Sequence, residues 1–374
     1  MNRQKIAFVI GGMGKGGAER VVSNLVGYYH HAGFEIEIVM LLHNKVEYDL
    51  PRDVKLTYID SRKYSPVLKP LVWLKKLRDI IKEDKPDVIV SFFARINLLV
   101  LLAAIGIDIP VYISERNDPK DDGRSIVIRF LTSILYPLSK GIVFQTDHAY
   151  RCFPKAIQKK GVIIPNPINI DFDFSRKKTK TYEIVTAGRL IEQKNHRLLI
   201  HAFEQVVRNN KLSNYKLYIY GEGRLKSKLS ELIESKGLNN HVFLMGKTSD
   251  IYNKVYNADL FVLSSDYEGL SNALLEAMFL ETPVISTNCA GSNELIADNE
   301  NGRLVPIGDC DRLAQAIEQN LLDDDKATAM AQKAKRKVSE YTLESICFKW
   351  NQLLFGAREA RFEARKGTVL RKQK

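Results

Sequence analysis

Residues 267–278 read Tyr-Glu-Gly-Leu-Ser-Asn-Ala-Leu-Leu-Glu-Ala-Met and lie between two apolar runs, 259–265 and 282–287. Short apolar runs bounded by turn residues are typical of buried strands. Ser271 and Asn272 are good helix N-caps, and the apolar residues after them recur at helical spacing. The segment therefore predicts a strand, a loop, a helix and a second strand, which is the repeating unit of a parallel α/β sheet.

Two carboxylates in this stretch predict a ligand. Glu268 lies in the loop before the helix, and Glu276 lies one turn after Asn272 on the same helical face. The free N–H groups at the helix start suit a phosphate, which nearby carboxylates would repel unless they bind something else. Sugar hydroxyls are such a partner. We therefore predict a nucleotide-sugar site, with Glu268 on the transferred sugar and Glu276 on the ribose; the alternative is two ordinary helix-surface glutamates.

Length and composition limit the class of protein. The chain has 374 residues, enough for two α/β domains, and a formal net charge of +12. Its four cysteines form no Cys-x-x-Cys pair, which argues against a zinc ribbon. The longest apolar run, 98–107, is half a membrane span, so we expect no bilayer crossing. Because no DNA- or RNA-binding motif is present, the charge favours an anionic membrane surface over nucleic acid.

A glycine-rich loop follows the first predicted strand and contains Gly12-x-Gly14-x-x-Gly17, formally a dinucleotide-binding fingerprint. That fingerprint expects an acid after the second strand, but the predicted strand over 35–42 runs into His-Asn. A Walker A loop is excluded, since the lysine of this loop precedes Gly16 rather than Ser or Thr. We predict that Gly14, Gly16 and Gly17 let the backbone approach a diphosphate or sugar. The alternative is a tight turn without a ligand.

A basic amphipathic segment covers 62–85, with eight Lys or Arg against three acids and with Trp73 among its leucines. Such a helix suits the surface of an anionic leaflet. It could equally pack its apolar face on its own sheet.

The alternation of strands and helices runs once to about residue 170 and then restarts. It predicts an N-terminal domain over 1–170, a polar linker over 171–181 and a C-terminal domain over 182–340. A last helix over 341–366 has an apolar stripe suited to packing on the first domain, and a basic tail, 367–374, follows. The predicted fold class is α/β, with two doubly wound parallel sheets that face a cleft.

Polar residues follow two of the predicted strands. Arg189 and Lys194 lie in the loop after the first strand of the second domain and would hold a diphosphate; a solvated basic loop is the alternative. Glu115, Arg116 and Asn117 end a strand of the first domain, ahead of a helix predicted over 126–138. Because α/β sheets bind ligands at the carboxyl ends of their strands, these three are acceptor-side candidates.

Together, three motifs resemble the retaining glycosyltransferases of family 4, which have the GT-B fold. They are Gly188-Arg189-Leu190 with Gln193-Lys194-Asn195, then Tyr220-Gly221-Glu222-Gly223, and then Glu268-x7-Glu276. The resemblance extends over nearly the whole chain. It implies a nucleoside-diphosphate-sugar donor, net retention and no metal or cofactor.

The resemblance also implies residue roles. Arg189 and Lys194 would bind the diphosphate, Glu276 the ribose and Glu268 the sugar, with Arg189, Lys194 and Glu268 acting in catalysis. The phosphate would also contact the backbone of Gly269, Leu270, Ser271 and Asn272. The base would lie near Glu222 and Lys247, and the first domain would contribute Gly14, Gly16 and Gly17.

Gly16-Gly17-Ala18-Glu19-Arg20 and 114–118 are similar to the subgroup that extends polyprenyl-diphosphate-linked or surface glycans. This implies a UDP-hexose or UDP-N-acetylhexosamine donor, a lipid-linked saccharide acceptor and a cytoplasmic, peripheral-membrane location. The chain departs from the family by having no histidine near 114–118, where Glu115 or Asn117 could fill the space. Two other functions stay open: a NAD-type oxidoreductase using the glycine loop, and a non-catalytic partner of another transferase.

Overall fold

The computed structural model describes residues 3–173, 179–209 and 211–356 and divides the chain into two compact units. Unit 1 comprises residues up to Pro167 together with the segment from Thr342 onward, and unit 2 comprises Ile168–Tyr341. The boundary lies close to the predicted end of the first domain at residue 170. Within the predicted linker, residues 174–178 lie outside the described part of the chain.

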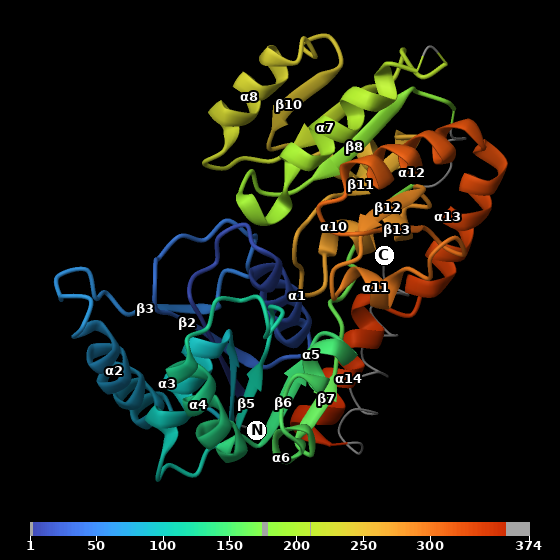
Figure 1. The fold of residues 1–374 in the computed structure, drawn as a ribbon. Helices are drawn as coiled ribbons and strands as arrows, with labels where there is room; N and C mark the ends of the chain where they lie inside the picture. The colour runs from blue at the N-terminus through green and yellow to red at the C-terminus, as the bar shows by residue number, and fades with distance from the viewer. Residues whose placement is uncertain (1–2, 174–178, 210, 357–374) are drawn as a thin grey trace. The chain divides into compact units, whose positions relative to one another are not determined.

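Unit 1 is built on a seven-stranded sheet in the order β3-β2-β1-β4-β5-β6-β7, with every pair parallel (Figure 1). The strands are β1 Lys5–Ile10, β2 Glu35–Met40, β3 Lys55–Tyr58, β4 Val88–Phe92, β5 Val111–Ser114, β6 Gly141–Phe144 and β7 Gly161–Ile163. Its helices are α1 Gly17–His31, α2 Lys69–Asp84, α3 Ala94–Ala104, α4 Ile126–Leu135, the 3₁₀ turn η1 Tyr136–Leu138, α5 Asp147–Arg151, α6 Lys155–Gln158 and α14 Leu343–Phe355. The central strands are buried and carry few polar residues, as expected for a parallel sheet covered on both faces.

Helices cover both faces of this sheet. α1 and α14 pack on one face, and α2, α3, the end of α4, α5 and α6 pack on the other. Trp350 of α14 is fully buried against Phe92, and Asn351 donates to Tyr28 of α1 at 3.0 Å. The C-terminal helix therefore belongs to the N-terminal unit. The predicted helix over 341–366 ends at Phe355, and the predicted tail lies outside the described residues.

The basic segment divides into two parts. Leu77 and Ile81 of α2 are buried, and Trp73 packs against the same core, so this part of α2 covers its own sheet. Before and at the start of α2, in contrast, Val67, Leu68 and Leu71 remain exposed. Within the described residues, no helix combines the length and the apolar character needed to span a bilayer.

Unit 2 contains a six-stranded parallel sheet in the order β10-β9-β8-β11-β12-β13. The strands are β8 Glu183–Ala187, β9 Lys216–Tyr220, β10 Val242–Gly246, β11 Leu260–Leu263, β12 Val284–Thr287 and β13 Arg303–Val305. The helices are the 3₁₀ turn η2 Glu192–Lys194, α7 His196–Val207, α8 Lys226–Ser235, α9 Ile251–Asn257, α10 Asn272–Phe279, α11 Ser292–Leu295, α12 Cys310–Leu322 and α13 Asp324–Val338. α7, α8 and α12 pack on one face and α9, α10 and α13 on the other. The predicted pair of doubly wound parallel-sheet domains is confirmed.

Candidate functional site

The strand order of unit 2 reverses between β8 and β11, because β9 and β10 continue on one side of β8 while β12 and β13 continue on the other side of β11. Ligands of doubly wound sheets bind outside the carboxyl ends of the strands at such a switch point. The loops that leave β8 and β11 there cover 188–195 and 264–271. They are the two segments in which the sequence predicts Arg189, Lys194 and Glu268.

Hydrogen bonds join these two loops along their length. The backbone N–H of Asp266 donates to the Gln193 carbonyl at 2.9 Å, and the Gln193 side chain donates to the Tyr267 carbonyl at 2.9 Å. Asn195 donates to the Asp266 carboxylate at 2.7 Å and also caps α7. Both loops are therefore held in one shape at the switch point.

Lys194 forms an ion pair with Glu268 inside this arrangement. The hydroxyl of Ser265 donates to the same Glu268 carboxylate at 2.7 Å, and Glu268 is buried. A buried carboxylate with two donors is fixed in position, and it in turn orients the ammonium group. Arg189 is the second residue of the same loop and is exposed, and its guanidinium makes no hydrogen bond or ion pair with the other described residues.

The helix α10 begins directly after the 264–271 loop. Ser271 is the N-cap, and its hydroxyl accepts from the Leu274 N–H at 3.4 Å, as the sequence predicts. Leu270 is buried, whereas Asn272 and Glu276 are half-buried one turn apart. A Cβ on Gly291 would lie 1.4 Å from the Gly269 carbonyl oxygen, so the loop after β12 packs backbone to backbone against the α10 entrance. Only glycine permits this approach.

The Gly221-Glu222-Gly223 turn packs against the 188–190 backbone in the same way. Gly221 has φ +145°, and a Cβ there would lie 1.9 Å from the Gly188 carbonyl oxygen. Glu222 is exposed and pairs with Lys226 at 3.4 Å, and Lys247 is exposed in the loop after β10. The structure thus puts the motif residues of unit 2 on neighbouring loops along one edge of the sheet, while their ligand roles remain predictions.

Sequence reasoning missed His196, the first residue of α7. Its side chain is buried near Lys194 and the backbone of Gly188 and Arg189, and neither ring nitrogen makes a hydrogen bond of normal geometry within the described residues. Burial lowers the pKa of His196 to about 4, and the Lys194 ammonium contributes in the same direction. The imidazole is therefore neutral at physiological pH, and the positive charge of this loop comes from Arg189 and Lys194.

In unit 1 the glycine loop also lies at a switch point, between β1 and β4. A Cβ on Gly12 would lie 2.1 Å from the His43 ring, and a Cβ on Gly16 would lie 2.1 Å from the Glu19 carboxylate. The Gly12 position thus faces an imidazole from the end of β2, where a dinucleotide site would place an acid for the ribose. This disfavours the oxidoreductase alternative. Gly14 and Gly17 lie in the same loop, with Gly17 exposed at the start of α1.

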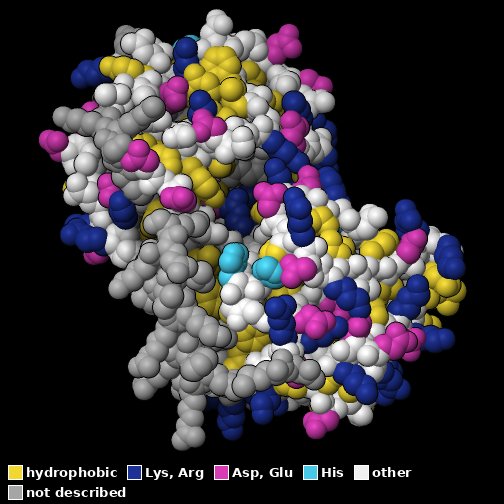
Figure 2. All heavy atoms as spheres, turned by 180° about the vertical axis from the view of Figure 1, so that it is seen from behind, with side chains coloured by type: hydrophobic (Ala, Val, Ile, Leu, Met, Phe, Trp, Pro, Cys, Tyr) yellow, Lys and Arg dark blue, Asp and Glu magenta, His cyan; other side chains and the backbone are white. Residues whose placement is uncertain are grey.

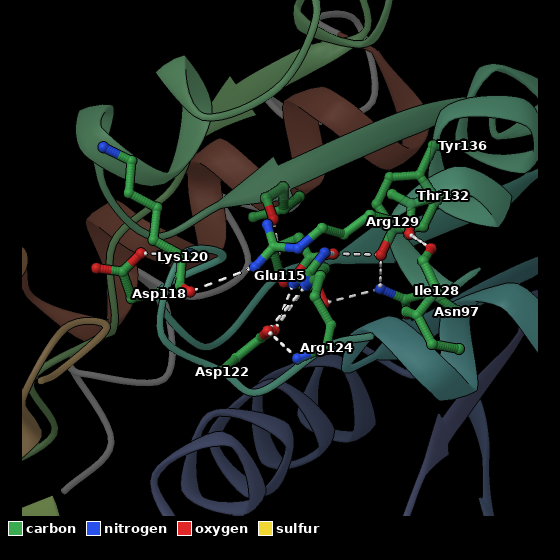
Figure 3. A network of polar contacts seen from close by, with 12 residues as sticks. Asn97, Glu115, Asp118, Lys120, Asp122, Arg124, Ile128, Arg129, Thr132 and Tyr136 are labelled. Carbon is green, nitrogen blue, oxygen red and sulfur yellow. Dashed lines mark hydrogen bonds and ion pairs between the residues drawn. The ribbon is translucent and has the colours of Figure 1, made fainter. Parts of the chain in front are cut away.

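Glu115, an acceptor-side candidate, is almost completely buried in a polar network at the carboxyl end of β5 (Figure 3). Arg124 donates to Glu115 at 2.8 Å and to Asp122 at 2.9 Å, and the Tyr136 hydroxyl also donates to Glu115. Burial opposes the charged guanidinium, but the carboxylates of Asp122 and Glu115 outweigh it and raise the pKa of Arg124. Glu115 is therefore held by its own chain.

The next two candidates differ in exposure. Arg116 is buried, donates to Asn166 at 3.0 Å and lies over the rings of Phe92 and Trp350, and burial lowers its pKa to about 9. Asn117 is exposed. Of the three candidates, Asn117 is the one on the surface of unit 1.

A histidine does lie beside this segment, although none is near it in sequence. His148, from α5 after β6, places Nε2 3.5 Å from Oδ2 of the buried Asp118. The sequence signal for His148 is its position just after β6, because the carboxyl ends of β6 and β5 lie at the same edge of the sheet. An imidazole, that of His148, therefore lies next to the 114–118 segment, in which the sequence contains no histidine.

Comparison with known proteins agrees with this geometry. The family model "Glycosyl transferases group 1" matches residues 168–337, and "Glycosyltransferase Family 4" matches residues 15–172. A Campylobacter jejuni N-acetylgalactosamine-N,N'-diacetylbacillosaminyl-diphospho-undecaprenol 4-alpha-N-acetylgalactosaminyltransferase is 30% identical over 363 residues, covering 90% of this chain and 96% of that protein. The chain belongs to the family 4 glycosyltransferases. The predicted enzyme class is confirmed.

A second C. jejuni relative of this transferase is 27% identical over 372 residues, covering 95% of this chain and 99% of its own length. It acts on GalNAc-alpha-(1->4)-GalNAc-alpha-(1->3)-diNAcBac-PP-undecaprenol. Among solved structures, Anabaena HepE in complex with UDP matches with a TM-score of 0.77 at 18% identity, covering 95% and 100% of the two chains. Staphylococcus aureus TarM matches with a TM-score of 0.77 at 17% identity, covering 95% and 99%. These structures confirm the GT-B fold.

Proposed function

We propose that this transferase moves a hexose or N-acetylhexosamine from a UDP-sugar to a lipid-linked saccharide, with net retention at the anomeric carbon. The observation that carries the proposal is the switch-point arrangement of unit 2, in which two hydrogen-bonded loops bring Lys194 and Glu268 together beside the entrance of α10. UDP in the structure of HepE supports the choice of nucleotide.

In this proposal the departing UDP is stabilised by positive charge from the protein. Arg189 and Lys194 hold the diphosphate, and the N–H groups of 269–272 at the positive end of α10 bind phosphate oxygens. Glu222 and Lys247 flank the base, and Glu276 binds the ribose. We expect no metal to be needed, because these groups supply the charge.

Retention requires the acceptor hydroxyl to attack from the face that UDP leaves. A phosphate oxygen of the departing UDP takes the hydroxyl proton, while Glu268 contacts the sugar and, through its ion pair, orients Lys194. Because Glu268 and Lys194 act together, removal of either should lower turnover more than it lowers donor affinity.

The two C. jejuni relatives carry undecaprenol-linked saccharides in their names, which supports a lipid-linked acceptor here. Such an acceptor lies at a membrane surface, and the formal charge of +12 suits an anionic leaflet. Seen from behind, basic and acidic side chains are interspersed over the surface (Figure 2), so the excess charge is not one compact patch on that face. We propose a cytoplasmic enzyme peripheral to the inner face of the cell membrane.

UDP release from a panel of UDP-sugars with lipid-linked acceptors tests the proposal. Lys194→Ala should lower turnover about 10²–10³-fold, as for loss of one preorganised donor, at roughly 3–4 kcal/mol. The matched control is Lys228→Ala, which removes an exposed lysine of α8 outside these loops and should leave turnover unchanged. Near-normal turnover in Lys194→Ala would contradict the proposed clamp.

A further inference from the structure

Helix α4 of unit 1 turns apolar side chains toward solvent. Its exposed large hydrophobic residues, 52–82% accessible, are Ile126, Val127, Phe130 and Ile134, and Leu138 continues the row in η1. The spacing 126, 130, 134 puts three of them on one stripe, while Thr132 and Leu135 are buried toward the sheet. We call these five exposed residues the α4 face.

This orientation is unusual for a helix on an α/β sheet, which normally presents polar residues to water. Contiguous exposed apolar residues of this kind mark interaction sites. From Ser125 to Ser139 the sequence contains no acid, and its single charged residue is Arg129. Arg129 is exposed and donates to the Lys120 carbonyl at 3.3 Å (Figure 3), so the α4 face carries a positive charge at its side.

The start of α2 adds a second exposed apolar group to unit 1. Val67, Leu68 and Leu71 are 48–83% exposed, and the 63–76 segment around them contains four lysines and no acid: Lys63, Lys69, Lys75 and Lys76. Both helices follow strands of the same sheet, so their first turns lie at its carboxyl edge. α2 and α4 each pack against α3, which places them on the same face of the sheet (Figure 1).

We propose that the α4 face and the exposed start of α2 form a docking surface for an anionic lipid bilayer. This deepens the proposed function and rests on it, since a lipid-linked acceptor must be reached at a membrane. The apolar side chains enter the boundary between headgroups and acyl chains, and the flanking lysines and Arg129 contact lipid phosphates. The carboxyl edge of unit 1, with Asn117 and the glycine loop, then lies beside the lipid surface.

The charge pattern favours a bilayer over a second copy of this chain. An isologous dimer through this surface would bring two sets of Lys69, Lys75, Lys76 and Arg129 together without an acid among them. A leaflet that contains anionic lipid supplies the opposite charge. Dimerisation is therefore the alternative to be measured.

Vesicle co-sedimentation of the full chain at low salt, without donor or acceptor, tests this surface. Phosphatidylcholine vesicles with and without phosphatidylglycerol are the probes. We expect binding to the anionic vesicles and at least a tenfold loss of that binding in the Ile126→Ser/Ile134→Ser variant. The control is Ile307→Ser, which removes an exposed isoleucine from unit 2 and should bind as the parent protein does.

Two further measurements separate the possible failures. UDP release with a short-chain, water-soluble acceptor should be unchanged in Ile126→Ser/Ile134→Ser, which also shows that the variant is folded. Equal vesicle binding by variant and parent, no binding by the parent, or a parent dimer that the variant abolishes would each overturn the docking surface. Variant-sensitive binding without any UDP release from UDP-sugars would leave the surface standing and overturn the proposed function alone.

Discussion

The carboxyl edges of the two sheets hold their charged residues differently. In unit 2, Lys194 and Glu268 form a pair whose side chains are 14% and 8% exposed, in loops that meet at the switch point. In unit 1, Arg124 and Glu115 form a pair whose side chains are 4% and 1% exposed, with Asp122 and Tyr136 closing the network. The first pair is accessible enough to take a ligand as a further partner, and the second is not.

This difference assigns different roles to similar chemistry. A Lys has three N–H donors, so an ammonium paired with one carboxylate can still bind a phosphate. A buried Arg between two carboxylates makes ion pairs in place of its hydrogen bonds to water, and its removal would leave the two buried carboxylates without a cation. In unit 2 the ion pair thus orients the Lys194 ammonium, for which we propose a phosphate-binding role, whereas in unit 1 the ion pair fixes the 115–124 loop.

The largest effect, on UDP binding, is expected from replacing a glycine of unit 2 that packs against backbone, in contrast to a glycine of unit 1 that has open space beside it. In Gly291→Ala, the new Cβ would lie 1.4 Å from the Gly269 carbonyl oxygen and 2.6 Å from its carbon. Because backbone cannot yield as a flexible side chain does, the α10 entrance must move, and we expect UDP binding to fall below detection in a calorimetric titration. Unit 2 should keep its secondary structure by circular dichroism.

The matched control is Gly27→Ala in α1 of unit 1, where a Cβ would meet nothing within 4 Å. That change should leave UDP binding unaltered and raise stability by about 0.5–1 kcal/mol, the usual gain of Ala over Gly within a helix. Wild-type UDP affinity in Gly291→Ala would show that the backbone contact does not shape the site.

A smaller effect is expected when the buried pair of unit 1 is broken. Arg124→Met leaves the carboxylates of Glu115 and Asp122 without their cation and should destabilise unit 1 by roughly 3–5 kcal/mol. Hydrogen exchange should show lost protection in β5 and α4 while α10 of unit 2 keeps its protection.

Two variants sharpen this comparison. Arg95→Met, at an exposed position of α3, should have little effect. Adding Glu115→Gln to Arg124→Met should restore part of the lost stability of unit 1, because it removes one of the two unpaired buried carboxylates. If the double variant is no more stable than Arg124→Met, the orphaned Glu115 charge is not the cause.

Much of unit 2 was predictable because its signals are local. The start of α7 at His196 follows from such signals, since Asn195 is a cap residue directly ahead of an apolar repeat. α12 likewise begins at Cys310, because the Asp309 side chain accepts from the Arg312 N–H. An Asp just ahead of an apolar repeat is a cap signal that the sequence itself contains.

Unit 1 was less predictable because its determinants are contacts between distant elements. The 115–124 sequence does not indicate that Arg124, rather than a ligand, binds the Glu115 carboxylate. The Tyr136 hydroxyl, which also donates to Glu115, comes from η1, outside this segment. The predicted 126–138 helix is apolar on most sides, which is typical of a buried helix. The sequence alone therefore does not show that one side of this helix faces solvent. His148 likewise reaches Asp118 only through the pairing of β5 with β6.

The smallest effect concerns pH and also separates the two units. Burial lowers the pKa of His196 in folded unit 2 to about 4, whereas its ordinary pKa in the unfolded chain is 6.5. As the pH falls through 6.5, the unfolded chain therefore takes up a proton while the folded His196 stays neutral. Stability from this residue is therefore complete above about pH 6.5 and decreases toward pH 4, by about 2 kcal/mol at pH 5.

In His196→Leu this component should be absent. The free energy of unfolding of unit 2, measured in urea, should therefore fall less between pH 7.5 and pH 5 in the variant than in the parent protein. As a control, the hydrogen-exchange protection of α4 in unit 1 should depend on pH in the same way in both proteins. If the stability of unit 2 depends on pH equally in His196→Leu and the parent, groups other than His196 cause the acid sensitivity.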